Sequence, residues 1–311
     1  MNSTPSSAPL PAMTASAGER ALVLGGGGST GNAWLIGVLA GLFDAGLDVT
    51  AADATIGTSA GSTAAAQLAG ATPPELYAAI LAAPLPPRSA SGAGAERART
   101  ANKPVTDHLD RMRALIAAAE DASDLRRRVG AAARERDAAA GDTWQTQWRA
   151  TVASRLPSQH WPERTVLITA VDAESGDPVV FDRHSGVELA DAVAASCSSG
   201  FAFGIGEHRY IDGGYRSNAE NADLAAGYAR VLVLAPFGGR SLTPESWGMH
   251  LSTQLDELRA HGSRVETIIP DGDAEHMFGA NAMDLSLRPP AARAGYEQGR
   301  ARAEQLAAFW H

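Results

Sequence analysis

Two short apolar runs, each ending in a turn of small residues, constrain the fold of this chain most strongly. The first, "RALVL" at residues 20–24, leads into "GGGGSTG", and the second, "ATIG" at 54–57, leads into "TSAG". Each turn opens a segment whose apolar or small residues recur at helical spacing. Two successive units of strand, tight turn and helix predict parallel strands with helices packed on their faces.

Later apolar runs extend this pattern along the chain. They are "TVLITAVDA" from residue 165, "PVVFD" from 178, "RVLVLAPF" from 230 and "VETIIP" from 265. Helical or loop segments separate them, and the C-terminal residues predict a final surface helix. We therefore expect an α/β protein: a three-layer α/β/α fold with a mainly parallel central sheet.

The chain of 311 residues suits one large domain with an insertion. We predict a disordered N-terminal arm at 1–19, because this segment is rich in Ser, Pro and Ala and lacks a continuous apolar stretch. The folded domain is expected over 20–311. A helical insertion is expected at about 72–162, where charged helical sequence replaces the strand pattern.

One face of the predicted insertion is apolar. The residues on this face are Val105, Leu109, Met112, Leu115, Ile116 and Ala119. Amphipathic helices usually bury such a face against the rest of their own domain, so we favour simple core packing. A lid or acyl-chain cover over the active site is the alternative.

Composition excludes several function classes. The formal charge is -9, and Lys and Arg form no basic stripe, so a nucleic-acid partner is not expected. The single cysteine, Cys197, rules out an internal disulfide and suits a cytoplasmic protein. No apolar stretch reaches the length of a membrane span, which leaves a peripheral membrane contact open. No loop arrays the oxygen ligands of a calcium site, and we predict no bound metal.

Three short motifs carry the chemistry. Ser59 lies in "GTSAG", a G-x-S-x-G turn that can expose a serine hydroxyl at a strand-to-helix junction. Gly26, Gly27 and Gly28 open the first helix, where backbone N–H groups and the helix dipole favour a negative charge. Asp212 lies in "YIDGG", which by itself is typical of a simple turn. Together the motifs offer a nucleophile, oxyanion donors and a base.

A dinucleotide-binding oxidoreductase is one alternative. Gly26, Gly28 and Gly31 also satisfy the pattern G-x-G-x-x-G, and Asp53 follows where a ribose-binding acid is wanted. Such an acid belongs at the end of the second strand, whereas Asp53 precedes that strand. The motif fits this function, but its context does not.

A conventional catalytic triad is a second alternative. His250, His261 and His276 all follow Asp212, which gives the chain order Ser, Asp, His of α/β-hydrolases. We rank this alternative lower, because a lone histidine in a loop is more often a surface or packing residue. His276 is the most plausible of the three.

The order and spacing of "ALVLGGGGSTGNAWLIGVLAGL", "TIGTSAG" and "YIDGG" resemble those of patatin-like phospholipases. The resemblance implies a serine esterase that cleaves acyl lipids or other carboxylic esters through an acyl-enzyme, without a cofactor. It assigns Ser59 as nucleophile, Asp212 as base, and Gly26, Gly27 and Gly28 as oxyanion donors. A related protein that binds a fatty acid without turnover is the remaining alternative. The oligomeric state is not indicated.

The sequence departs from the family pattern in two places. Many relatives carry a basic residue inside the glycine loop, where this chain has Ser29 and Thr30. Relatives also have a proline-containing stretch after the cysteine, whereas here a Ser-Ser-Gly run stands at 198–200 and the next proline is Pro236. Because Ser and Gly loosen a loop that proline would stiffen, we expect the second departure to affect the substrate pocket more than the dyad.

Overall fold

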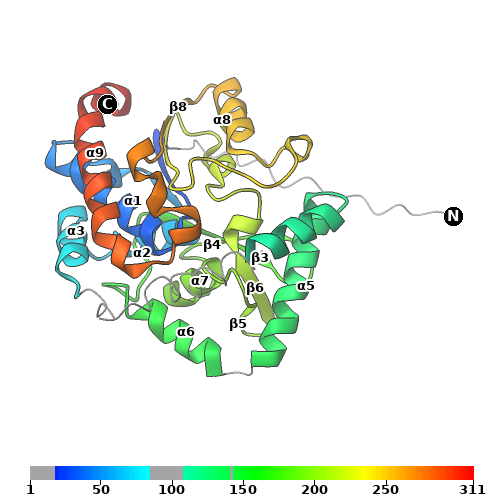
Figure 1. Cartoon of the computed structure of the whole chain (residues 1–311). Coiled ribbons are helices and arrows are strands. Elements are labelled where there is room, and N and C mark those ends of the chain that lie inside the picture. Colours follow the sequence, from blue (N-terminus) through cyan, green and yellow to red (C-terminus); the bar gives the residue numbers. More distant parts are fainter. Residues whose placement is uncertain (1–17, 85–107, 141–142) are drawn as a thin grey trace.

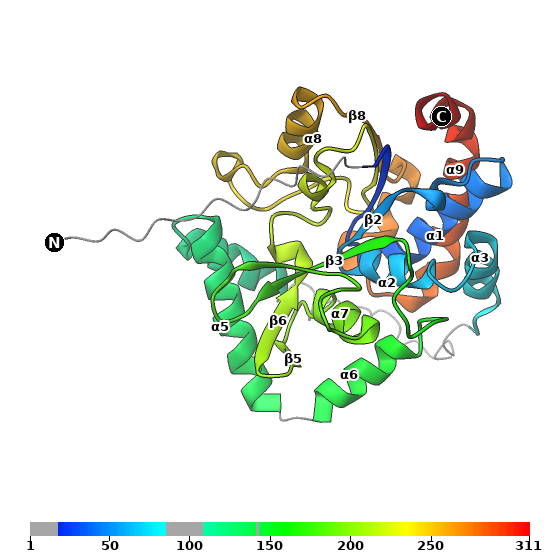
Figure 2. The ribbon, with the colours of Figure 1, turned by 180° about the vertical axis from the view of Figure 1, so that it is seen from behind.

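A computed structural model describes residues 18–84, 108–140 and 143–311. Within these residues an eight-stranded sheet lies between two layers of helices (Figures 1 and 2). This architecture confirms the expected three-layer α/β fold. The predicted N-terminal arm lies outside the described residues, apart from its last two positions.

The main part of the sheet is parallel. Its strands are β1 (Arg20–Leu24), β2 (Ala54–Gly57), β3 (Thr165–Asp172), β7 (Arg230–Leu234) and β8 (Arg264–Ile268). They lie in the order β3-β2-β1-β7-β8, and every neighbouring pair is parallel. Each coincides with an apolar run of the sequence. β1, β2 and β7 are buried on both faces and are therefore apolar along most of their length, whereas the edge strand β8 is fully buried only at Ile268.

Three antiparallel strands complete the sheet beside β3. They are β4 (Pro178–Phe181), β5 (Phe203–Ile205) and β6 (His208–Asp212). β4 and β6 both pair with β3, and β5 pairs with β6. The sequence did not predict β5, since this short strand lies in a glycine-rich stretch.

One helical layer covers the face of the sheet that presents Leu22, Leu24 and Ile168. Its helices are α1 (Gly28–Asp44), α2 (Ala60–Gln67), α3 (Pro73–Ala82), α7 (Leu189–Ser196) and α9 (Arg288–Trp310). Their apolar side chains and those of the strands form the largest buried cluster, which has Trp34 and Trp310 among its fully buried members. In Figure 2 these helices stand on one side of the strands.

The other face is covered by α8 (Leu251–Ala260), α5 (Ala122–Ala140) and the short helix η3 (Ala222–Ala225). α8 packs Leu251 and Leu258 against the parallel strands, and α5 packs Leu125 and Val129 near Val171. Further 3-10 turns are η1 (Val49–Ala51), η2 (Gly213–Tyr215), η4 (Glu245–Trp247), η5 (Gly272–Met277), η6 (Gly279–Asn281) and η7 (Leu285–Leu287).

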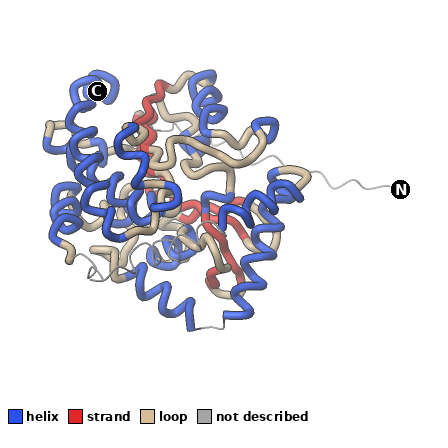
Figure 3. The backbone as a smooth tube through the Cα atoms, in the orientation of Figure 1, coloured by secondary structure: helices blue, strands red, loops and turns tan. Residues whose placement is uncertain are grey.

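The segment predicted as an insertion is helical wherever the structure describes it between α3 and β3. It contains a helical stretch at 108–118, then α5 and α6 (Thr143–Ala153). Four residues of the predicted apolar face, Met112, Leu115, Ile116 and Ala119, pack against the α5 cluster. Leu109 is half-buried outside this cluster, and Val105 lies outside the described residues. α5 contacts β6 and α6 contacts α7, so the two helices flank the antiparallel edge of the sheet (Figures 1 and 3). No helix in the described residues is long and apolar enough to cross a bilayer.

Candidate active site

Ser59 occupies a strained turn between β2 and α2. Its φ is 52° and its ψ is -114°, a conformation that non-glycine residues rarely adopt. A Cβ atom on Gly61 would lie 1.9 Å from the backbone oxygen of Leu24, so only glycine permits this close approach to β1. The Ser59 N–H donates to Ser196 Oγ at 2.9 Å. The turn is thus held by packing and hydrogen bonding on both sides.

The strand register brings Asp212 level with Ser59. Gly57 of β2 lies beside Ile168 of β3, and Ala170 of β3 lies beside Asp212 of β6. Ser59 lies two residues after Gly57. Ala170, the neighbour of Asp212, likewise lies two residues after Ile168, so Ser59 and Asp212 are at the same level of the sheet. The Ser59 hydroxyl donates to Asp212 Oδ2 at 2.8 Å, although the two residues are 153 positions apart.

The Asp212 carboxyl group is buried, with 6% of the residue exposed. Burial raises its pKa to about 6, while hydrogen bonds from the Gly214 N–H and the Ser59 hydroxyl act in the opposite direction. The Gly214 N–H donates to Oδ1 at 2.8 Å. A Cβ atom on Gly213 would lie 2.1 Å from Thr169 Oγ1, so this glycine of the motif lets the turn approach β3.

A buried polar network lies beneath this pair and was not predicted from the sequence. Thr58 Oγ1 and Thr169 Oγ1 are 2.9 Å apart, and the Asn221 side-chain amide donates to Thr58 Oγ1 at 3.0 Å. The same amide donates to the backbone oxygen of Gly213 at 2.9 Å. All three polar side chains are fully buried. The network therefore ties the serine turn, β3 and the turn after Asp212 to one another.

The glycine loop lies against the serine turn, since a Cβ atom on Gly26 would be 3.5 Å from Ser59 Cβ. The Gly26 N–H donates to the backbone oxygen of Ala219 at 2.7 Å. The Gly26 N–H, predicted as an oxyanion donor, is therefore engaged by a backbone oxygen in this structure. Within the described residues, the N–H groups of Gly27 and Gly28 donate no hydrogen bond.

Arg288 reaches the glycine loop from the start of α9. Its Nη1 donates to the Ser29 backbone oxygen at 2.8 Å and lies 3.1 Å from Ser29 Oγ. Its Nη2 donates to Asn32 Oδ1 at 3.3 Å. Ser29 and Arg288 are 259 positions apart, so no local pattern in the sequence signals the contact.

The Ser-Ser-Gly segment after the cysteine is anchored to the acid. The Ser198 backbone oxygen accepts the Asp212 N–H at 3.0 Å, and the Tyr215 hydroxyl donates to the Ser199 backbone oxygen at 2.8 Å. Beyond these bonds, Phe201 is 37% exposed and its ring packs beside Trp144. Hydrogen bonds thus fix the part of the loop where proline is missing.

None of the histidines considered for a triad bonds the acid within the described residues. The rings of His250, His261 and His276 each bond a backbone oxygen a few residues away in the chain. Both carboxylate oxygens of Asp212 are instead engaged by Ser59 and Gly214. The described residues therefore give a Ser-Asp pair without a histidine.

Asp53 stands at the opposite end of β2 from the glycine loop. Its carboxylate accepts the Arg20 N–H at 2.8 Å, where β1 begins. A ribose-binding acid needs the other end of the strand, so this placement argues against a dinucleotide site.

The Cys197 thiol near the turn is not activated as a nucleophile. Burial raises the pKa of the Cys197 thiol to about 11, and the thiol donates to the Ser59 backbone oxygen at 3.1 Å. Across the described ranges, no group of three or more His, Cys, Asp or Glu side chains is placed to hold a metal ion.

Comparisons with known proteins match this chain to one family description. The family description "Patatin-like phospholipase" matches residues 22–224, which include all three motifs. A search of curated proteins finds no match.

Two solved structures cover 91% of the chain. They are the type III effector protein ExoU, at 16% identity, and full-length ExoU in complex with SpcU from Pseudomonas aeruginosa, at 18%. Both have TM-scores of 0.33, and the chain spans about half of their length, 54% and 53%. The fold assignment therefore rests on the family match and the observed strand order.

Proposed function

The chain belongs to the patatin-like phospholipase family, and we propose that it hydrolyses carboxylic esters of acyl lipids with Ser59 as nucleophile and Asp212 as base. The family supports lipid acyl hydrolysis as the general activity. The proposal adds the two residues, the acyl-enzyme and the donors of the oxyanion site.

The observation that carries the proposal is the bond from the Ser59 hydroxyl to Asp212 Oδ2, at 2.8 Å. A serine hydroxyl is a weak nucleophile unless a base within hydrogen-bond reach accepts its proton. The strained backbone at Ser59 adds support, because such conformations persist mainly where the surrounding structure and the function require them.

In the first half of the proposed reaction, Ser59 Oγ attacks the ester carbonyl carbon while its proton moves to Asp212 Oδ2. The tetrahedral intermediate carries a negative oxygen, which the N–H groups of Gly27 and Gly28 stabilise together with the N-terminus of α1. The intermediate then collapses. The C–O bond to the alcohol breaks, Asp212 returns the proton to the leaving alkoxide, and the acyl group stays on Ser59.

In the second half, water replaces the alcohol. Asp212 accepts a proton from the water as the water oxygen attacks the acyl-enzyme, and a second tetrahedral intermediate forms in the same site. Its collapse breaks the bond to Ser59 Oγ, which regains the proton from Asp212. The products are a carboxylic acid and an alcohol, and the enzyme is regenerated without a cofactor.

Hydrolysis of p-nitrophenyl butyrate and of a lysophospholipid tests the proposal. Ser59→Ala and Asp212→Asn should each reduce kcat by about a thousandfold or more, because a nucleophile and its base act as a unit. Both replacements nearly preserve side-chain volume, so the far-UV circular dichroism should not change.

Two control variants accompany this test. Asp172→Asn removes a carboxylate that caps the turn after β3 through the Glu174 and Ser175 N–H groups, and it should keep wild-type activity. His276→Ala should do the same. A loss with His276→Ala as large as that with Ser59→Ala would favour a triad, and full activity of Ser59→Ala would exclude Ser59 as the nucleophile.

A further inference from the structure

The glycine loop is fixed on both sides of Gly27 and Gly28, whose N–H groups bond nothing in the part of the chain that the structure describes. On the side of β1, the Gly25 N–H donates to Leu234 at 2.9 Å and the Gly26 N–H donates to Ala219 at 2.7 Å. On the side of α1, the Thr30 N–H donates to the backbone oxygen of Ala282 at 3.0 Å. These bonds define where the loop can lie.

Among the described residues, Arg288 is the only one whose charged side chain forms hydrogen bonds to this loop. Its Nη1 forms two hydrogen bonds to Ser29. Ser29 directly follows Gly28, which is one of the two proposed oxyanion donors. Within the described residues no carboxylate forms an ion pair with Arg288. Burial lowers its pKa, yet an arginine stays charged near neutral pH. No neighbouring acid in the described ranges therefore neutralises its positive charge.

The contacts of Arg288 continue toward the serine turn. Asn32 Oδ1 accepts from Nη2 of Arg288, and the Asn32 side-chain amide donates to Gln67 Oε1 at 3.0 Å. The same amide lies 3.5 Å from the backbone oxygen of Ala60, the residue after Ser59. Arg288 thus joins α9 to the start of α1 and, through Asn32, to α2.

We propose that Arg288 is a positioning residue that holds the N–H groups of Gly27 and Gly28 in place and offsets the negative charge that develops beside them. This inference rests on the proposed function. The loop itself contains no basic residue, so the positive charge comes from a helix at the far end of the chain. A planar guanidinium can bind two acceptors in fixed directions, whereas a lysine cannot reproduce both bonds.

Steady-state kinetics with p-nitrophenyl butyrate test the role. Arg288→Gln should lower kcat by about tenfold or more and leave KM within about twofold, because the oxyanion exists only in the transition state and the intermediates. Arg288→Lys should retain part of kcat, since it keeps the charge and loses the paired bonds. The rate of reaction with a fluorophosphonate should fall by a similar factor, because the phosphonyl oxygen uses the same donors.

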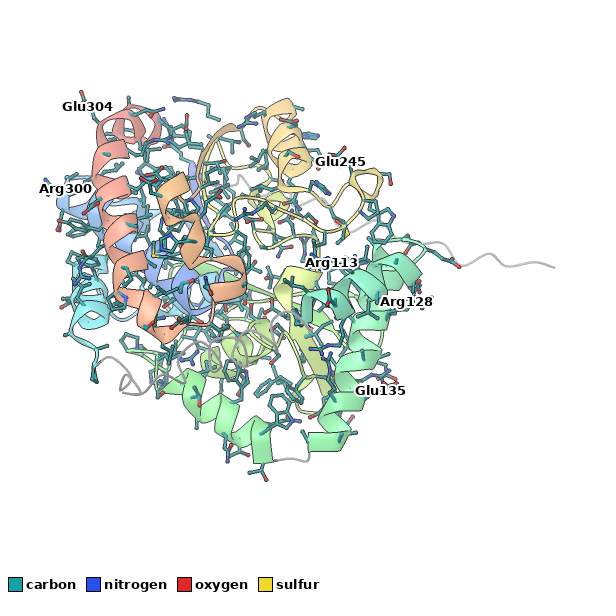
Figure 4. The ribbon with its side chains drawn as sticks, in the orientation of Figure 1. Arg113, Arg128, Glu135, Glu245, Arg300 and Glu304 are labelled. Carbon is teal, nitrogen blue, oxygen red and sulfur yellow. The ribbon has the colours of Figure 1, made fainter. Side chains whose placement is uncertain are left out.

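Chemical rescue separates this role from a structural one. Methylguanidinium added to Arg288→Ala should restore part of kcat, while it should not affect wild type. Arg300→Gln is the matched control: it removes another arginine of α9, whose side chain is exposed and lies over the ring of Tyr296. In Figure 4 Arg300 lies on the outer side of this helix. It should keep wild-type kcat.

Three outcomes would overturn the inference. One is a kcat of Arg288→Gln equal to that of Arg300→Gln, and another is a change confined to KM. The third is a loss explained entirely by the unfolded fraction, without rescue by methylguanidinium and with Arg288→Lys no better than Arg288→Gln. If wild type is active and the Arg288 variants keep its kcat, this inference alone is overturned. Folded wild type that hydrolyses no ester and reacts with no fluorophosphonate overturns the proposed function as well.

Discussion

At the scale of single residues, the raised pKa of Asp212 predicts how activity depends on pH. The carboxylate must be ionised to accept the serine proton, and burial raises its pKa to about 6. The value of kcat/KM should therefore rise with pH through a limb near 6 and level off above it. A pH profile from 4.5 to 8 measures this limb. A limb near 4, the ordinary value for aspartate, would contradict the buried state of the acid.

Glu220 gives a second pH dependence, in stability rather than activity. Its carboxyl group is 1% exposed and has no hydrogen-bond partner among the described residues, and burial raises its pKa to about 8. The unfolded chain loses this proton near 4.5, whereas the folded chain keeps it to about 8. The free energy of unfolding should therefore fall as pH rises between these values, by up to about 1.4 kcal/mol per pH unit.

Urea unfolding of Glu220→Gln between pH 6 and 8 tests this prediction. Asp212 contributes little to the pH dependence of stability between pH 6 and 8, because its pKa of about 6 lies at the lower end of this range. The variant should remove most of the slope of stability against pH, while the exposed Glu304→Gln should leave it unchanged. Equal slopes in wild type and Glu220→Gln would show that Glu220 is ionised in the folded protein.

Among the site residues, the sequence predicted those whose roles depend on local turns. Ser59 and Asp212 each follow a strand and carry glycines at fixed offsets, and these offsets are local. The Ala219 oxygen that accepts the N–H of the predicted donor Gly26 is distant in the chain, so no local pattern signals this bond. Asn221 and Arg288 act only through distant partners, so a single sequence contains no pattern for them.

At the scale of elements, α1 and α9 approach each other closely at glycines that are four residues apart on each helix. Gly37 and Gly41 lie on α1, and Gly295 and Gly299 lie on α9. A Cβ atom added at any of the four would lie between 2.1 and 2.4 Å from a backbone oxygen of the facing helix. The sequence predicted α9 as a surface helix. Its outer side is exposed, and on its buried side the glycines permit close backbone contact with α1.

Replacing Gly299 by alanine should destabilise the protein. The new Cβ would lie 2.3 Å from the Val38 backbone oxygen, so the two helices must separate. Overpacking typically costs about 1–3 kcal/mol, which outweighs the roughly 1 kcal/mol that alanine gains over glycine in a helix. The urea midpoint should fall. Glu304→Ala, on the exposed side of α9 in Figure 4, serves as the control, and an unchanged midpoint for Gly299→Ala would contradict the close packing.

Other elements were predicted well, for a physical reason. The central strands β1, β2 and β7 of the parallel sheet are buried on both faces, so each one is an almost continuous apolar run. β5 escaped prediction because it has three residues and contains glycine. Its place in the sheet depends on pairing with β6, which no local composition reveals.

At the scale of the whole molecule, the proposed dyad joins two parts of the sheet. Ser59 follows a strand of the parallel part, and Asp212 ends a strand of the antiparallel edge. β3 lies between them and sets their relative level, while Thr169 of β3 contributes to the buried network below. The bounds predicted for the domain and its helical insertion remain predictions. In the structure, α5 and α6 stand on either side of this antiparallel edge (Figure 1).

The most direct test of the proposed dyad is intact-mass detection of a covalent adduct after treatment with a fluorophosphonate ester. Folded wild type, Ser59→Ala and Asp212→Asn are compared at pH 7.5. This pH is about 1.5 units above the pKa of Asp212, so the carboxylate is ionised. We expect one adduct in wild type, none in Ser59→Ala and a much slower reaction in Asp212→Asn. An adduct that persists in Ser59→Ala, or its absence from folded wild type, would contradict an activated Ser59.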